Sequence, residues 1–326
     1  TMSSIPQRIA EELNVKIQQV LAAVNLLDDG ASVPFISRYR KEVTGGLDDT
    51  QMRNLEERLR YLRELEDRRT VILNSIGEQD KLSAQLEAAI RAADTKTRLE
   101  DLYLPYKPKR RTKGQIAIEA GLQPLADTLL ADPNQHPEVI AVSYINQEAD
   151  VPDSKAALDG AKFILMERFS QDADLIESLR QFLLQNGQLS ARVVEGKQQE
   201  GEKFRDYFEH DEALSRVPSH RMLAMLRGRN EGFIRLSISV GDPEDKITAH
   251  PAEAMIAAHW QISHQGRPAD DWLQEVVRWS WRIKLYTHLE SDLLLQLRQT
   301  AEDEAIKVFA SNMKDLLLAA PAGPKV

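Results

Sequence analysis

The stretch WLQEVVRWSWRIKLYTHLESDLLLQL, from Trp272 to Leu297, decides the fold class of this chain. Apolar residues recur in it every three or four positions, which is the period of one α-helical face. The helical pattern extends from Pro268 to Ala320, so we predict one long helix, or two helices joined near Thr300, packed along its length. The predicted apolar face consists of Trp272, Val276, Trp279, Ile283, Tyr286, Leu289, Leu293 and Leu297.

A second long helix is predicted nearer the N-terminus. Asp48 followed by Gln51 has the spacing of a capping box, in which each side chain bonds the other residue's backbone N–H. An apolar stripe follows, marked by Leu55, Leu59, Leu62, Ile72 and Ile76. The opposite face is rich in Arg and Glu at helix-pair spacing, which is typical of a solvated surface.

The remaining sequence predicts short helices and little sheet. Residues 188–195 and 233–240 alternate between apolar and polar side chains, as half-buried strands do. We expect Ser219 to cap a helix that runs through Arg227, with Gly228 near its end. The predicted fold is therefore mainly α, a multi-lobed helical scaffold with a long C-terminal helix and at most a small β hairpin.

Composition narrows the class of protein. The 326 residues are 42% hydrophobic and 29% charged, with only 6% aromatic residues, a balance that suits soluble helical domains. There is no cysteine, which excludes disulfides and thiolate metal sites and fits a cytoplasmic protein. The formal net charge of −9 argues against a polyanion-coating protein, so any nucleic-acid contact must come from local patches. No apolar run reaches the roughly 18 residues that span a membrane.

A search for catalytic patterns finds none. The sequence lacks GxGxxG, a P-loop lysine motif, HExxH and a GxSxG elbow. His259 and His264 are five residues apart, which places them poorly for a shared metal ion on one helical face. We therefore predict no catalytic residue, no metal site and no cofactor, and expect that the chain is not an enzyme.

Three basic clusters stand out against the acidic background. The middle cluster lies in the 17 residues from Leu102 to Ile118, which contain no acidic side chain. Positive charges this close together repel one another unless an anion or a carboxylate from elsewhere in the chain neutralises them. The clusters are Arg38, Arg40 and Lys41; Lys107, Lys109, Arg110, Arg111 and Lys113; and Arg221, Arg227 and Arg229.

The first cluster has two interpretations. In one, its cations contact phosphates and Tyr39 stacks on a base. In the other, which we favour from sequence, a short amphipathic helix packs Phe35, Ile36 and Tyr39 inward while its arginines pair with nearby acids.

The middle cluster also has two interpretations. Pro105 and Pro108 favour a stiff, extended segment that lays its cations along a phosphate backbone. Alternatively, the segment is an internal strap anchored by Tyr103, Leu104 and Tyr106, whose arginines reach an acidic helix at Glu56, Glu57 and Glu64. For the third cluster we favour a structural role, with cations near a helix C-terminus, where the helix dipole favours positive charge.

The three clusters lie in strings that resemble signature stretches of the bacterial Tex family of transcription accessory proteins. These strings are VPFISRYRKEVTGGLDD (33–49), LEDLYLPYKPKRRTKG (99–114) and VPSHRMLAMLRGRNEG (217–232). RLRYLREL (58–65) and AEDEAIKVFASNMKDLLLAAP (301–321) are similar to further family segments in the same order.

The resemblance implies an N-terminal region with a helix-turn-helix-like part, followed in full-length members by a YqgF-type RNase-H-like domain, helix-hairpin-helix motifs and an RNA-binding OB-fold. We expect three parts: an N-terminal helical domain (1–131), a central helical lobe with minor strands (132–266) and a helical spine (267–326). The resemblance also implies a non-catalytic scaffold. Its expected partners are RNA or DNA, bound mainly by the later domains, and RNA polymerase or other transcription proteins. Two alternatives stay open: part of a metal-dependent nuclease whose site lies in the RNase-H-like domain, and a purely protein-binding platform.

Overall fold

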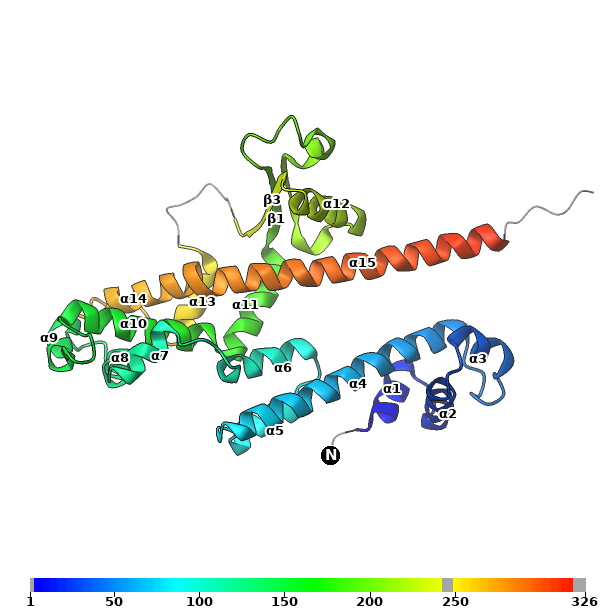
Figure 1. Cartoon of the computed structure of the whole chain (residues 1–326), viewed down its shortest axis with the longest axis horizontal. Coiled ribbons are helices and arrows are strands. Elements are labelled where there is room, and N and C mark those ends of the chain that lie inside the picture. The colour runs from blue at the N-terminus through cyan, green and yellow to red at the C-terminus, as the bar shows by residue number, and fades with distance from the viewer. Residues whose placement is uncertain (1–2, 242–248, 319–326) are drawn as a thin grey trace, which may run out of the picture. The chain divides into compact units, whose positions relative to one another are not determined.

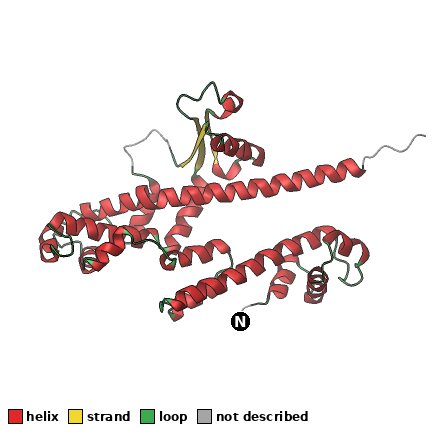
Figure 2. Ribbon diagram, viewed as in Figure 1, coloured by secondary structure: helices red, strands yellow, loops and turns green. Residues whose placement is uncertain are grey.

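The chain is mainly α-helical, as predicted. The computed structural model describes residues 3–241 and 249–318, and nearly all regular structure in them is helix (Figures 1 and 2). Two compact units divide between Lys107 and Pro108, and each is described by itself. The three-part division expected from sequence remains a prediction about domains.

The first unit is built on the long helix α4, which begins and ends close to its predicted limits. The Asp48 carboxylate accepts a 2.7 Å hydrogen bond from the Gln51 backbone N–H, and the Gln51 side chain accepts one of 2.9 Å from the Asp48 N–H. The predicted capping box is therefore confirmed. The helices of this unit are α1 (Ile5–Leu13), α2 (Ile17–Asp28), α3 (Val33–Tyr39), α4 (Asp49–Glu78), α5 (Ala84–Ala92) and α6 (Lys96–Tyr103), followed by a 3₁₀ turn (Leu104–Tyr106).

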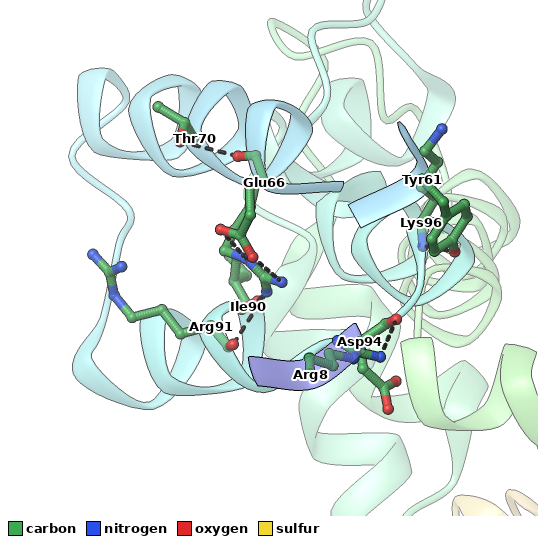
Figure 3. A network of polar contacts seen from close by, with 9 residues as sticks. Arg8, Tyr61, Glu66, Thr70, Ile90, Arg91, Asp94 and Lys96 are labelled. Carbon is green, nitrogen blue, oxygen red and sulfur yellow. Dashed lines mark hydrogen bonds and ion pairs between the residues drawn. The ribbon is translucent and has the colours of Figure 1, made fainter. Parts of the chain in front are cut away.

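A buried arginine ties α5 to α4. Arg69 is only 3% exposed, and its guanidinium donates to the carbonyl oxygens of Ile90 and Arg91 at the end of α5 and to the Glu66 carboxylate. Figure 3 shows Glu66 directed toward Ile90 and Arg91. Arg69 thus satisfies terminal carbonyls that have no partner within their own helix.

The second unit is organised around α10 (Ser154–Ser170), which packs against α7 (Lys113–Glu119), α8 (Gln123–Ala131) and α14 (Asp270–Trp279). Its other helices are α9 (Pro137–Ala141), α11 (Ala173–Asn186), α12 (Ser219–Asn230), α13 (Pro251–His259) and α15 (Tyr286–Leu318), with 3₁₀ turns at Val142–Tyr144, Glu202–Tyr207 and Leu214–Arg216.

The predicted C-terminal helix is interrupted earlier than expected. A π-helical segment, Ser280–Leu285, joins α14 to α15, and the helix continues without a break past Thr300. Because a π turn holds more residues than an α turn, it shifts which positions face inward. Trp281 and Leu285 are buried, whereas the predicted face members Trp279 and Ile283 are 39% and 50% exposed. The helix was predicted correctly, but the phase of its apolar face at these residues was wrong.

The small sheet has three antiparallel strands in the order β2–β1–β3. β1 (Gln188–Val193) and β3 (Ile234–Ser239) lie at the two predicted strand positions, while β2 (Glu209–Ala213) was not anticipated. In the register, Leu189 pairs with Glu212 of β2 and with Ile238 of β3. Figure 1 shows the sheet and α12 on the same side of α15.

The expected cap of α12 was wrong. Pro218 occupies the cap position, and the Ser219 hydroxyl instead donates to the Glu304 carboxylate of α15. Gly228 lies near the end of the helix, as expected, and an added Cβ there would fall 2.7 Å from Ile234 Cγ1. A glycine is needed here because β3 approaches the helix so closely.

We expect Gly160→Ala to destabilise the protein, although alanine favours helix. The new Cβ would overlap the Leu122 side chain and fall 3.3 Å from Ala117 Cβ. Such overpacking costs about 1–3 kcal/mol, more than the up to ~1 kcal/mol that alanine gains over glycine in a helix. Gly77→Ala in α4 is the control, because nothing lies within 4 Å of its added Cβ. Denaturant unfolding followed by circular dichroism should rank G77A at or above wild type and G160A below; equal stabilities would contradict this packing.

Candidate nucleic-acid interface

The first basic cluster lies on an exposed surface at the end of α3. The helix begins at a Ser32 cap with Pro34 in its first turn, and Val33 and Ile36 are its buried anchors. Ser37 is buried as well, whereas the aromatic and basic side chains of the helix and of the turn that follows are exposed. We call this set the α3 surface: Phe35, Arg38, Tyr39, Arg40 and Lys41.

The aromatic side chains of the α3 surface do not pack inward as the favoured interpretation required. Phe35 is 41% exposed and Tyr39 is 56% exposed, and their ring centroids lie 5.4 Å apart. The Arg40 guanidinium lies over the Phe35 ring, 5.2 Å from its centroid, and donates a 3.1 Å hydrogen bond to the Tyr39 carbonyl oxygen. A helix of seven residues has room for only one narrow buried face, which Val33 and Ile36 already occupy.

The turn after α3 is fixed by its own bonds. Gly45 and Gly46 have positive φ angles of 66° and 92°, a conformation that glycine adopts at little cost. The Gln19 side chain donates to the carbonyl oxygens of Thr44 and Gly45 at 3.3 and 3.0 Å. Thr44 is buried, and its hydroxyl donates a hydrogen bond to the Lys41 carbonyl oxygen within the turn. The cations just before this turn are therefore carried on an ordered backbone.

The arginines of the first cluster do not form the expected acid pairs. Among the residues that the structure describes, no ion pair is formed by Arg38, Arg40 or Lys41, and all three are exposed. The neighbouring Glu42 is exposed as well. The structure thus contradicts the inward-packing interpretation and leaves three cations accessible beside two aromatic rings.

The middle cluster divides between the two units, with Lys107 at the end of the first. Between Lys107 and Thr112 the chain has no regular secondary structure, as expected for a proline-punctuated segment. Lys107, Arg110 and Lys113 are exposed, and so is Lys109, which has a polar or ionic contact. The Lys113 ammonium lies 5.0 Å from the Phe163 ring centroid.

Only part of the strap interpretation of the middle cluster holds. Tyr103 is an anchor, since it is 6% exposed and shares a 2.7 Å hydrogen bond with Ser75. Arg111, however, pairs with Glu119 in its own unit, not with the acidic helix that we had expected. Glu64, one of the expected acids, pairs with Lys96.

The third cluster is partly structural. Arg221 donates to the Glu212 carboxylate at 2.8 and 3.1 Å, and His210 shares a 2.7 Å hydrogen bond with the same group. Burial acts to raise the pKa of Glu212, but the bonds to Arg221 and His210 together outweigh it and hold that pKa below its ordinary value of 4.5. Arg227 and Arg229 lie in the last turn of α12 without an ion pair among the described residues.

Two cavities of the second unit carry ionisable groups. One of about 700 Å³, between α13 and α14, is lined mostly by small residues together with Glu253 and Arg278. Another of about 690 Å³ lies between α10 and α14, where Lys162 pairs with Glu275 at 3.0 Å and Lys155 with Asp159 at 3.2 Å. In the described ranges, no group of three or more His, Asp or Glu side chains is placed to hold a metal ion.

Sequence reasoning missed the second cavity because its wall includes Trp279. That residue was assigned to the buried face, but the buried side of α14 is formed by Leu273, Val276 and Val277, and Trp279 lies off it. Among the described helices, none is both long and apolar enough to cross a membrane.

Sequence comparisons identify the family of this helical chain. Residues 132–309 match the family described as Tex central region-like, and residues 3–77 match the Tex-like protein N-terminal domain. The chain therefore belongs to the Tex family, with a match to both the N-terminal domain and the central region.

Named relatives extend this result. The chain is 58% identical to protein YhgF of Escherichia coli over 97% of its own length and 41% of that protein. It is 54% identical to the transcriptional accessory protein Tex of Neisseria gonorrhoeae, over 98% of the chain and 42% of that protein. It is 25% identical to the human S1 RNA-binding domain-containing protein 1, over 97% of the chain and 32% of that protein. The chain thus spans about two fifths of its bacterial relatives.

We expect Glu212→Gln to lower the melting temperature at neutral pH by roughly 2–6 °C, because it weakens the three hydrogen bonds that the carboxylate forms with Arg221 and His210. A carboxylate whose pKa is lowered by folding stabilises the protein above its ordinary pKa and loses this effect as pH falls through the lowered value. The difference between E212Q and wild type should therefore be constant above about pH 5 and shrink in more acidic solution. Glu209→Gln, an exposed change on the same strand, is the control. A pH-independent difference would contradict the assignment.

Proposed function

We propose that this chain is a helical scaffold and binding region of a transcription accessory protein, without a catalytic role of its own. The observation that carries this proposal is the uncovered end of α15. Among the described side chains of this helix, Ala301 is the last that is fully buried, Glu304 accepts a hydrogen bond from Ser219, and Ala305 is half-buried. Beyond them α15 runs on past α12 (Figure 1).

The uncovered part of α15 carries an apolar stripe. Ile306, Phe309, Met313, Leu316 and Leu317 recur at three- and four-residue spacing and fall on one side of the helix. Their exposed fractions run from 43% for Met313 to 74% for Leu317. A contiguous apolar stripe of this kind is usual where another part of a protein packs. We infer that further domains of the protein cover it, and that α15 holds them at a fixed distance from the helical core.

The nucleic-acid role rests on the relatives and on the accessible cations. One relative is named for an S1 RNA-binding domain and another as a transcriptional accessory protein, and the chain matches only part of each. We propose that RNA or DNA is bound mainly by domains outside this chain. The α3 surface and the Lys107–Lys113 segment add phosphate contacts, and RNA polymerase or other cytoplasmic transcription proteins are the candidate protein partners.

The scaffold proposal predicts what the α15 stripe does. Replacing Ile306, Phe309, Met313 and Leu317 by Gln should leave the chain's own helix content and melting temperature nearly unchanged, because exposed side chains contribute little to stability. The same variant should lose association with the remaining length of the protein supplied as a separate polypeptide, measured by co-purification and calorimetry.

Val308→Gln is the matched control, because Val308 is 55% exposed but lies off the stripe. It should retain association. If the four-residue variant associates as wild type does, α15 is not the spine on which the other domains are mounted.

The middle cluster gives a separate prediction. Replacing Lys109, Arg110, Arg111 and Lys113 by Gln in the intact protein should weaken nucleic-acid binding and make its salt dependence shallower. Each lost phosphate contact removes about 0.7–0.9 from the slope of log affinity against log salt. Arg221→Gln is the comparison variant, since its charge serves Glu212. Unchanged affinity and slope in the four-residue variant would rule this contribution out.

A further inference from the structure

We propose that the α3 surface binds unpaired nucleotides, with Tyr39 stacking on a base while Arg38 and Lys41 contact the flanking phosphates. The inference rests on the proposed nucleic-acid role and specifies which form of nucleic acid the N-terminal unit recognises. Two aromatic rings, Phe35 and Tyr39, are exposed on α3, whereas the aliphatic side chains Val33 and Ile36 of the same helix are buried.

The ring of Tyr39 is available and its hydroxyl has no hydrogen-bond partner among the described residues. Tyr39 is 56% exposed, and its ring is tilted by 49° to that of Phe35, so the two rings do not cover each other face to face. Arg40 lies over Phe35 and supports the pair from that side. Tyr39 is therefore the ring with room for an incoming planar group.

The surface is ordered before any ligand arrives. Val33 and Ile36 anchor α3, and the Gln19 side chain holds the carbonyl oxygens of the following turn. Arg40 is fixed by its bond to the Tyr39 carbonyl oxygen. A ligand thus meets side chains whose backbone is already in place, which lowers the entropic cost of binding.

Charge selects the ligand class. The segment from Pro34 to Gly46 carries three cations and one acid, Glu42, in a chain whose net charge is −9. Accessible cations beside an exposed aromatic ring are the combination that binds single strands, because the cations follow the backbone and every base offers a face for stacking. In a duplex those faces are covered by neighbouring base pairs, so Tyr39 has nothing to stack on.

The test is fluorescence anisotropy of the chain with a labelled 12-nucleotide single strand of RNA and of DNA, and with the duplex of the same sequence. Tyr39→Ala should weaken single-strand binding by about 5- to 150-fold, which corresponds to the loss of one stacked base. Tyr39→Phe keeps the ring and should retain affinity. Arg38→Gln with Lys41→Gln should weaken binding and reduce its salt dependence. Phe309→Ala, which removes an exposed ring from α15, is the matched control.

Each outcome decides the inference. Preferential binding of single strands that is lost in Y39A and kept in Y39F supports it. Equal binding of duplex and single strand, insensitive to Tyr39 but weakened by the charge variant, overturns base stacking and leaves the phosphate contacts of the proposed function intact. If the chain binds neither the single strands nor the duplex, the inference is overturned too. The scaffold proposal is tested independently by the α15 variant.

Discussion

The second unit depends on how closely helices can approach α10. This helix is buried on more than one face, and the buried residues include a lysine, Lys162. Gly160 admits Leu122 and Ala117, and Gly114 of α7 lies against Glu167, so two glycines set the distance between neighbouring backbones. Lys162 is tolerated because Glu275 answers its charge and the Trp279 ring lies 5.2 Å from its ammonium. The packing therefore fixes the α14 end of the spine, and α15 follows from there.

The π-helical segment matters because it changes phase without ending the helix. A loop at Ser280 would let α15 reorient, whereas a π turn keeps the backbone hydrogen-bonded and only rotates the later residues. Leu285, Leu289 and Leu293 can then be buried against the same unit that holds Val276. The Tyr286 hydroxyl donates to the Ile238 carbonyl oxygen at 2.9 Å, which ties the start of α15 to β3. A continuous helix that is anchored at one end can hold another domain in a fixed position at its other end, as the proposed scaffold role requires.

Sequence patterns predicted the long elements well because periodicity accumulates over many residues. The α4 stripe and its Asp48–Gln51 box needed no tertiary information. The misses have local causes. The sequence of β2 is EHDEA, which has no apolar–polar alternation to predict a strand. Its side chains bind polar partners such as Arg221 instead. The π segment depends on the packing around Ser280, and the outward rings of α3 follow from the shortness of that helix, which only the coordinates show.

The basic clusters show why charge counts alone could not locate a candidate interface. Arg221 has a carboxylate partner, Glu212, so its charge is already compensated within the fold. Arg38 and Lys41 belong to the same family strings and look equivalent in sequence, yet no ion pair is formed by either in the described chain. The difference comes from geometry: Glu212 lies on β2 within reach of Arg221 at the start of α12, whereas the acid nearest to Arg38 in sequence, Glu42, is exposed. In an acidic protein, cations that folding leaves unpaired are the ones with free energy available for an external phosphate.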